Sequence, residues 1–352
     1  MFISKKYYFY VDVIRSVAIF LVVLLHVSAP FVTAFRRIPL NQWLVANFYD
    51  SISNQSVPLF LMISGFLILS RYKSDQLKMF VKKRFLKVFI PFIIWSVFYL
   101  FWRIYFHGES LNLTLMFRQF ITTKTYYHLG FFYYLLSLYL ITPFVYQLIR
   151  NRLLIFPFLF LWFIFISINE LFRPLKLYSR IGTEMFTHYL GFYIAGYALG
   201  NNILLTLKKM GQKLLFMIFF ISNLFIFIGT TYLSIWKGKF ISILYIYYTP
   251  FVFFSSLTSF LLLKNIKWDN FNRQRVWLTN LIKRVSLISF GIYLIHPIII
   301  ELLYRYLMND SINNIPMHPA IFIPLFTVIV FALCSIIVSG IKKVPYARFI
   351  IP

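Results

Sequence analysis

Acidic residues and cysteine are scarce in this chain of 352 residues, which has nine Asp and Glu residues and a single Cys. One cysteine, Cys334, excludes an intramolecular disulfide. The sequence has no Gly-rich phosphate loop and no Cys/His cluster with metal-ligand spacing. We therefore expect no metal site and no permanently bound cofactor. Charged residues make up only 12% of the chain, about half the share of a soluble domain.

Hydrophobic residues supply 61% of the chain and form many runs of membrane-spanning length. The sequence predicts an all-α, polytopic membrane protein with about ten transmembrane helices. The fifth and sixth predicted spans are short. The predicted spans are 11–32, 51–69, 85–106, 128–149, 153–168, 185–200, 214–233, 240–263, 286–307 and 319–341.

The net charge of +26 follows the predicted topology. Most Lys and Arg residues lie in every second segment between spans, which places both termini in the cytoplasm by the positive-inside rule. The excess charge then serves topology and contact with anionic lipid, and we expect no nucleic-acid partner. The first span is long, carries ionisable residues and is followed at once by a second, so it is not a cleaved signal peptide. We expect one membrane domain over residues 1–352.

Arg15 and His26 are the most informative residues, because ionisable side chains inside a span usually mark a functional site. Eleven residues bring the two within roughly 20° on one helix face and about 16 Å apart along the axis. One helix thus carries a cation near the inner surface and a titratable base towards the outer one. This layout suits a long, anionic, two-ended ligand.

Simpler interpretations exist for both residues. Asp12 lies three residues before Arg15, so the two side chains can pair at the helix start, with Arg15 extended to the lipid headgroups. A lone His26 could hydrogen-bond a neighbouring helix. Their combination on one face favours the functional interpretation.

The predicted loop between the second and third spans, Arg71 to Lys87, is strongly basic. Arg84 and Lys87 are three residues apart, and on one helix face they could hold phosphate groups through charge-assisted hydrogen bonds. A cluster next to a membrane can also simply fix topology and touch anionic lipid. Both interpretations stay open.

Two further histidines belong to predicted spans. His128 opens the fourth span and belongs, like His26, to the outer half of the membrane. His296 precedes Pro297, which loosens the helix, so its ring could bond a freed carbonyl or face a cavity. In the second span, Ser64 and Gly65 permit close approach of another helix.

Together these segments resemble the acyltransferase 3 family of membrane-bound acyltransferases over essentially the whole chain. The matching motifs, in order, are Arg15 to His26, Val57 to Gly65, the basic run before the third span, Tyr127 to Leu129 and Gly291 to Pro297. The runs 10–26, 56–66 and 127–136 look most similar to those of O-acetyltransferases that modify enterobacterial common antigen. Lys87 departs from the family pattern, since many members have a second Arg there.

The resemblance implies an enzyme of the bacterial cytoplasmic membrane that uses acyl-CoA, most simply acetyl-CoA, as donor. The acceptor would be a hydroxyl of a cell-surface or lipid-linked glycan. Arg15, Arg84 and Lys87 would hold the donor phosphates, and His26 would act as general base or as a covalent acyl carrier. His128 would orient the acceptor or stabilise the oxyanion. An exporter or flippase of such a glycan is the main alternative, and a non-catalytic membrane partner is a weaker one.

Overall fold

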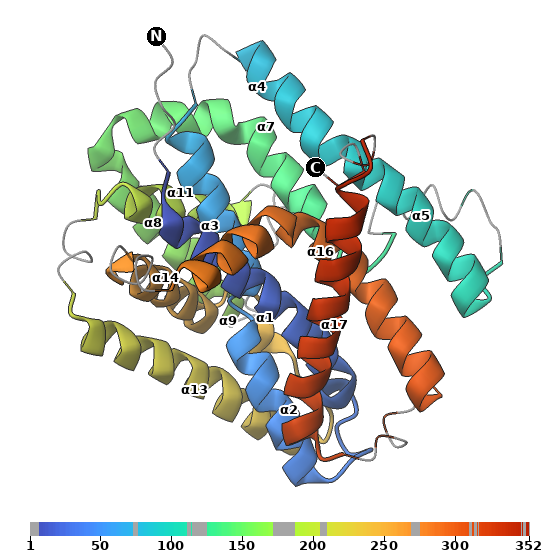
Figure 1. Ribbon diagram of the computed structural model, residues 1–352. Coiled ribbons are helices and arrows are strands. Elements are labelled where there is room, and N and C mark those ends of the chain that lie inside the picture. The colour runs from blue at the N-terminus through green and yellow to red at the C-terminus, as the bar shows by residue number, and fades with distance from the viewer. Residues whose placement is uncertain are drawn as a thin grey trace.

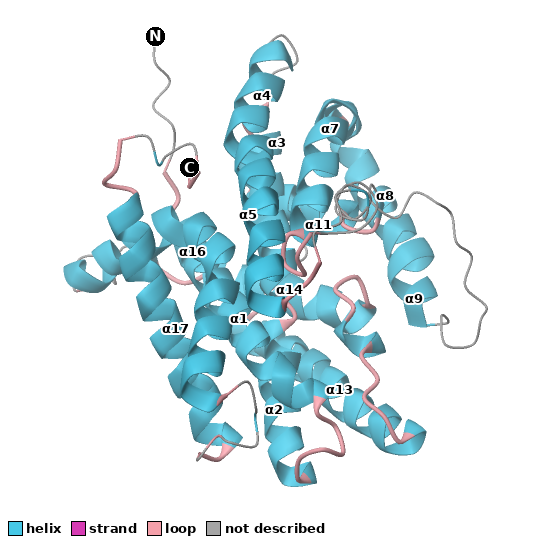
Figure 2. Ribbon diagram, turned by 90° about the vertical axis from the view of Figure 1, so that its right-hand side faces the viewer, coloured by secondary structure: helices cyan, strands magenta, loops and turns pink. Residues whose placement is uncertain are grey.

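The computed structural model describes residues 7–72, 77–110, 114, 125–171, 187–204, 210–268, 275–309, 312, 315, 317–345, 347 and 350–351. Within these residues the chain forms helices joined by turns, and no strand is present (Figure 1, Figure 2). The all-α expectation is therefore confirmed for the described part of the chain.

The principal helices follow the predicted hydrophobic runs, except that the second predicted span, 51–69, is preceded by a further helix, so that its apolar helical stretch begins at Leu40. They are α1 (Phe9–Thr33), α2 (Leu40–Ser53), α3 (Ser56–Leu69), α4 (Leu77–Arg84), α5 (Ile90–His107), α7 (Gly130–Arg150), α8 (Ile155–Trp162), α9 (Asn169–Leu171), α11 (Leu190–Gly200), α13 (Gln212–Lys237), α14 (Pro250–Lys264), α16 (Val276–Met308) and α17 (Pro319–Ile341). Short 3₁₀ turns cover Arg152–Leu154 and Ile243–Tyr245, and π-helical segments cover Phe85–Phe89 and Phe163–Ile168.

Eight helical stretches in the described residues are long and apolar enough to cross a membrane, so the chain is a polytopic membrane protein. The fifth and sixth predicted spans correspond to shorter apolar helices, Arg152–Ile168 and Leu190–Gly200. Residues 185 and 186 of the sixth predicted span lie outside the described residues. The first has just the roughly 17 residues that a straight crossing requires, and the second, with 11 residues, falls below that length.

Helix α1 is the centre of the bundle and packs against α2, α3, α14, α16 and α17. Its neighbours bury most of its length, from Val11 to Val32. A helix with side chains buried on several faces can carry polar groups away from lipid, which is what Arg15 and His26 require.

Helices α3 and α11 cross with their backbones in contact, as Gly65 in the sequence led us to expect. A Cβ atom at Gly65 would lie 1.8 Å from the carbonyl oxygen of Tyr193, and one at Gly196 would lie 2.0 Å from that of Met62. Neither position can therefore accept a larger side chain without moving the two helices apart. This crossing fixes the second and sixth predicted spans against each other.

From Leu77 onwards, the basic stretch before the third span is helical instead of forming the predicted loop. Helix α4 runs through the π-helical segment Phe85–Phe89 into α5, so one long helical stretch covers 77–107 and begins earlier than the predicted 85–106. Pro91 stands in the first turn of α5 and lacks an N–H group, which loosens the hydrogen bonding there. π-helical turns of this kind often occur at functional sites.

Candidate active site

Arg15 on α1 is held by a chain of hydroxyl contacts. Its Nη1 atom donates to Ser286 Oγ on α16 at 3.2 Å, and Ser286 Oγ donates to Asp12 Oδ1 at 2.6 Å. The other Asp12 oxygen accepts from the Tyr7 hydroxyl at 2.6 Å. Asp12 and Arg15 are therefore linked through Ser286. The bond to Ser286 is the only hydrogen bond that Arg15 makes within the described residues. Most of the five guanidinium N–H donors remain for a ligand.

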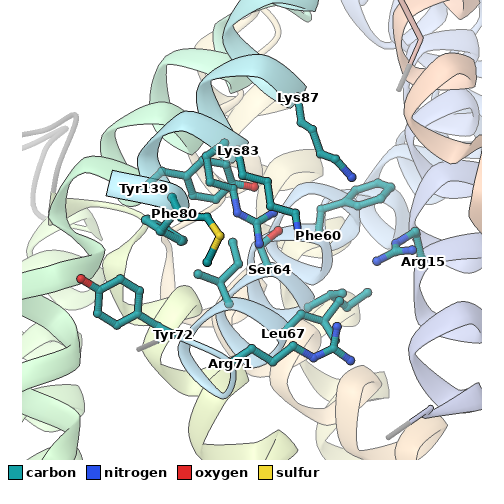
Figure 3. Close-up of a pocket in the computed structure, with 14 residues that line it drawn as sticks. Arg15, Phe60, Ser64, Leu67, Arg71, Tyr72, Phe80, Lys83, Lys87 and Tyr139 are labelled. Carbon is teal, nitrogen blue, oxygen red and sulfur yellow. The ribbon is translucent and has the colours of Figure 1, made fainter. Parts of the chain in front are cut away.

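A cavity of about 520 Å³ opens beside Arg15 and is lined by five cationic side chains (Figure 3). They come from four parts of the chain: α1, the end of α3, α4 and the π-helical segment. Figure 3 shows Arg15, Arg71, Lys83 and Lys87 reaching the cavity from different sides. The cations are Arg15, Arg71, Lys83, Arg84 and Lys87, and no acid lines this cavity in the described residues.

Arg84 also contacts two aromatic rings. Its guanidinium carbon lies 5.7 Å from the ring centre of Phe80 and 5.4 Å from that of Tyr139. Its buried Nε atom has no hydrogen-bond partner among the described residues. The rings thus orient this cation towards the cavity while leaving donor capacity unused.

A second cavity, of about 430 Å³, adjoins the first and extends into the bundle. The two share six lining residues, Arg15, Phe60, Ser64, Arg84, Lys87 and Tyr139. The second cavity adds Lys342, which donates to the Leu287 carbonyl at 2.8 Å, and reaches Tyr293 on α16. Burial and the nearby Lys87 lower the pKa of Lys342. Like charges this close repel one another, so this region favours the binding of anions.

Three histidines from three parts of the chain meet beyond Tyr293. The ring centres of His26 and His296 are 5.1 Å apart at an interplanar angle of 27°, and those of His128 and His296 are 5.5 Å apart. Tyr293 lies 5.5 Å from His128 and 5.8 Å from His296, and its hydroxyl donates to the His128 carbonyl. We call His26, His128 and His296 the histidine cluster. In the described chain, no three His, Cys, Asp or Glu residues are arranged to hold a metal ion.

Tyrosines and one acid surround this cluster. Tyr127 lies 4.8 Å from His26, and the hydroxyl of Tyr126 donates to Glu301. Glu301 also accepts from Trp102 Nε1 at 2.8 Å. Arg305, one turn later on α16, lies over the Phe106 ring and donates to the Phe106 carbonyl at 3.0 Å. The side chains of Glu301 and Arg305 thus both contact aromatic residues.

The structure brings the sequence-predicted residues together as two groups. Arg15, Arg84 and Lys87 line both cavities, and His26 and His128 lie in the histidine cluster. Arg15 thus lies with the cations that line the cavities, and His26 lies in the histidine cluster. A long ligand site between them stays a prediction.

Three residues of this site were not singled out from the sequence. Ser286 is one small hydroxyl residue among many, and Lys342 matches the ordinary basic end of a last span. Arg71 was visible only as the first residue of a basic stretch. Only the packing of α1 against α16 and α17 shows that Ser286 and Lys342 belong to this site.

Comparison with known families identifies the class of protein. The model of the acyltransferase 3 family, described as an acyltransferase domain, matches residues 8–339. The chain therefore belongs to this family of membrane-bound acyltransferases. No curated protein and no solved structure matches the chain.

Proposed function

We propose that the protein is an O-acyltransferase that moves an acyl group, most simply acetyl, from cytoplasmic acyl-CoA to a hydroxyl of a cell-surface or lipid-linked glycan. The observation that carries this proposal is the joined pair of cation-lined cavities, which ends at Tyr293 with the histidine cluster next to it. Acyl-CoA is divided in the same way, because it has phosphates at one end and a thioester at the end of a long arm.

The larger cavity matches the nucleotide end of the donor. Arg15, Arg84 and Lys87 would hold the phosphates through charge-assisted hydrogen bonds, and Lys87 would do so as a point charge without the paired geometry of an Arg. The aromatic side chains of Tyr72 and Phe80 line the same cavity and offer faces for a base. The second cavity would take the pantetheine arm towards Tyr293.

The histidine cluster supplies the acid–base chemistry. His26 would accept the proton of the acceptor hydroxyl while its oxygen attacks the thioester carbon, and His128 would stabilise the oxyanion or orient the acceptor. The C–S bond then breaks, and the leaving thiolate takes the proton from His26. A covalent acyl-His26 intermediate uses the same residues and is the second form of this proposal.

The membrane face from which the acceptor approaches follows from the predicted topology. With both termini in the cytoplasm, Arg15 lies near the inner surface of a bacterial cytoplasmic membrane, and His26 lies in the outer half. A lipid-linked glycan could then meet the acyl group from outside. Enterobacterial common antigen is our first choice of acceptor, because of the resemblance around residues 10–26, 56–66 and 127–136.

An exporter or flippase of a glycan remains the second candidate, since intramembrane ionisable groups also occur in transporters. An exporter of a neutral glycan has no use for five cations at one end of the bundle, whereas a flippase could bind the phosphates of a lipid-linked sugar there. A transporter would move substrate without coenzyme A, so donor dependence separates the two functions.

Coenzyme A release from acetyl-CoA by purified protein in nanodiscs tests the proposal. We expect slow release by the wild type and a loss of at least a hundredfold in His26→Ala, in line with the usual contribution of a general base. His318→Ala is the matched control, because His318 is exposed at the start of α17, where its ring accepts from the Ala320 N–H group at 3.3 Å. Equal release by wild type and His26→Ala would contradict the role of His26, and no donor binding at all would favour the exporter.

A further inference from the structure

The cations around the two cavities fall into two sets. Arg15, Arg84 and Lys87 line both cavities, so they lie where the two cavities meet. Arg71 and Lys83 line only the larger cavity (Figure 3), and both residues are exposed. This second pair therefore belongs to the part of the larger cavity that the second cavity does not share.

Arg71 and Lys83 come from two elements that an aromatic contact holds together. Arg71 follows the end of α3 and directly precedes Tyr72, and Lys83 lies three residues after Phe80 on α4. Residues three apart on a helix share a face, so Lys83 and Phe80 point to the same side of α4. The ring centres of Tyr72 and Phe80 are 5.1 Å apart, and the ring planes are inclined by 88°. All four side chains line the larger cavity, which thus offers two cations beside two aromatic rings.

Acyl-CoA carries its phosphates in two places. A pyrophosphate joins the adenosine to the pantetheine arm, and a phosphomonoester on the ribose 3′ oxygen points away from that arm. The monoester has a charge of about −1.5 to −2 at neutral pH, and its three terminal oxygens are strong acceptors. With the arm in the second cavity, the pyrophosphate would reach the cations that both cavities share. The monoester and the base would then lie in the unshared part of the larger cavity.

We propose that Arg71 and Lys83 bind the ribose 3′-phosphate of the donor and thereby distinguish coenzyme A from other adenine nucleotides. This inference rests on the proposed function, because it divides the donor site of that function into two anion subsites. ATP and ADP have the same base and a 5′ polyphosphate, so cations that hold a pyrophosphate would bind them too. Selectivity for coenzyme A then needs a contact to a group that these competitors lack, and the 3′-phosphate is such a group.

The other lysines of α4 allow a direct contact to be separated from the general field of a basic helix. Lys78 and Lys82 are exposed on the same helix and line neither cavity. At physiological ionic strength, charges beyond about 8 Å are largely screened. Loss of Lys82 should therefore affect a bound nucleotide weakly and without regard to its 3′ group, whereas loss of Lys83 should affect ligands with a 3′-phosphate.

The test compares the binding of coenzyme A and of 3′-dephospho-coenzyme A to purified protein in nanodiscs, by titration calorimetry at physiological ionic strength. The two ligands share base, pyrophosphate and arm, so the ratio of their dissociation constants reports the 3′-phosphate alone. We expect the wild type to prefer coenzyme A by about tenfold or more, the lower end of the range for a charge-assisted hydrogen bond.

Arg71→Gln and Lys83→Gln should each reduce this preference to about threefold, because two similar contacts share a tenfold effect. The double variant should bind both ligands equally. Lys82→Gln is the matched control and should keep the wild-type preference. Unchanged affinity for 3′-dephospho-coenzyme A in every variant shows that the fold and the pyrophosphate subsite are intact.

Equal binding of the two ligands by the wild type would overturn the proposal and leave donor binding in place. The same conclusion follows if Arg71→Gln and Lys83→Gln weaken both ligands to the same extent. If the wild type binds neither ligand, the proposed function fails and this inference fails with it.

Competition by smaller nucleotides gives a second decision. Adenosine 3′,5′-bisphosphate and ADP both lack the pantetheine arm and carry two phosphates, but only the first has a 3′-phosphate. We expect adenosine 3′,5′-bisphosphate to displace coenzyme A from the wild type at lower concentration than ADP does. The double variant should not distinguish them. Equal displacement from the wild type would also overturn the proposal.

Discussion

At the scale of single residues, the guanidinium group of Arg15 is divided between a contact within the protein and a cavity. One nitrogen is engaged by Ser286, which is itself bonded to Asp12, and the remaining donors face a cavity. This contact fixes the direction of a side chain that would otherwise extend to the lipid headgroups. Preorganisation of this kind lowers the entropy cost of binding an anion.

Arg15→Ala should therefore weaken donor binding more than catalysis. We expect the KM for acetyl-CoA to rise about tenfold to a hundredfold, the usual range for a lost hydrogen bond to a charged group. Arg150→Ala is the control, because Arg150 lines neither cavity. Steady-state kinetics with both variants decides the matter, and an unchanged donor KM would remove Arg15 from the phosphate site.

Lys342 predicts a pH dependence of donor binding. Its pKa is lowered by burial and by Lys87, and a bound phosphate would favour the protonated ammonium. Binding should weaken as the pH rises through this lowered pKa, at less alkaline pH than an ordinary lysine would give. Lys342→Arg should remove this part of the dependence, because a guanidinium stays protonated. Titration of coenzyme A at neutral and alkaline pH provides the measurement, and identical profiles would count against a phosphate contact by Lys342.

At the scale of elements, the α3–α11 crossing is the tightest contact near the site. Gly65→Ala should destabilise the protein by about 1–3 kcal/mol, because the new Cβ meets the Tyr193 carbonyl at 1.8 Å. Gly211→Ala is the matched control, since no atom lies within 4 Å of its added Cβ. Thermal unfolding in nanodiscs would show a lower midpoint for the first variant only. Equal midpoints would mean that the two helices do not cross at Gly65.

The helical stretch 77–107 illustrates what sequence reasoning finds and misses. The hydrophobic run located α5, and the basic residues before it were assigned to a loop. The π-helical segment Phe85–Phe89 allows the helix to continue through Pro91, so Arg84 and Lys87 lie on a helix and face the same cavities. Their spacing predicted the shared direction, whereas the π turn left no sequence signal.

At the scale of the whole molecule, the order of hydrophobic runs predicted the polytopic helical fold, because each span must satisfy its own backbone hydrogen bonds. Which spans become neighbours was not predictable, since lipid-facing and buried apolar residues look alike in a sequence. The histidine cluster shows this limit. His26 was assigned a role, but its stacking against His296 depends on the packing of α1 against α16.

The predicted topology can be checked with introduced cysteines, because Cys334 is buried and the chain has no other cysteine. Arg37→Cys lies after α1 and should react with a membrane-impermeant maleimide in intact cells. Lys343→Cys follows α17 and should react only after the membrane is permeabilised. Both side chains are exposed. The reverse pattern would place the termini, and with them the cation-lined cavities, outside the cytoplasm.

The cations around the two cavities have a consequence for turnover. They would hold phosphates that remain on the carrier after its acyl group has left, so spent coenzyme A should bind nearly as tightly as the donor. The protein would then be inhibited by its own product, and its rate would follow the ratio of acetylated to free coenzyme A. Modification of the cell surface would thereby report the metabolic state of the cytoplasm.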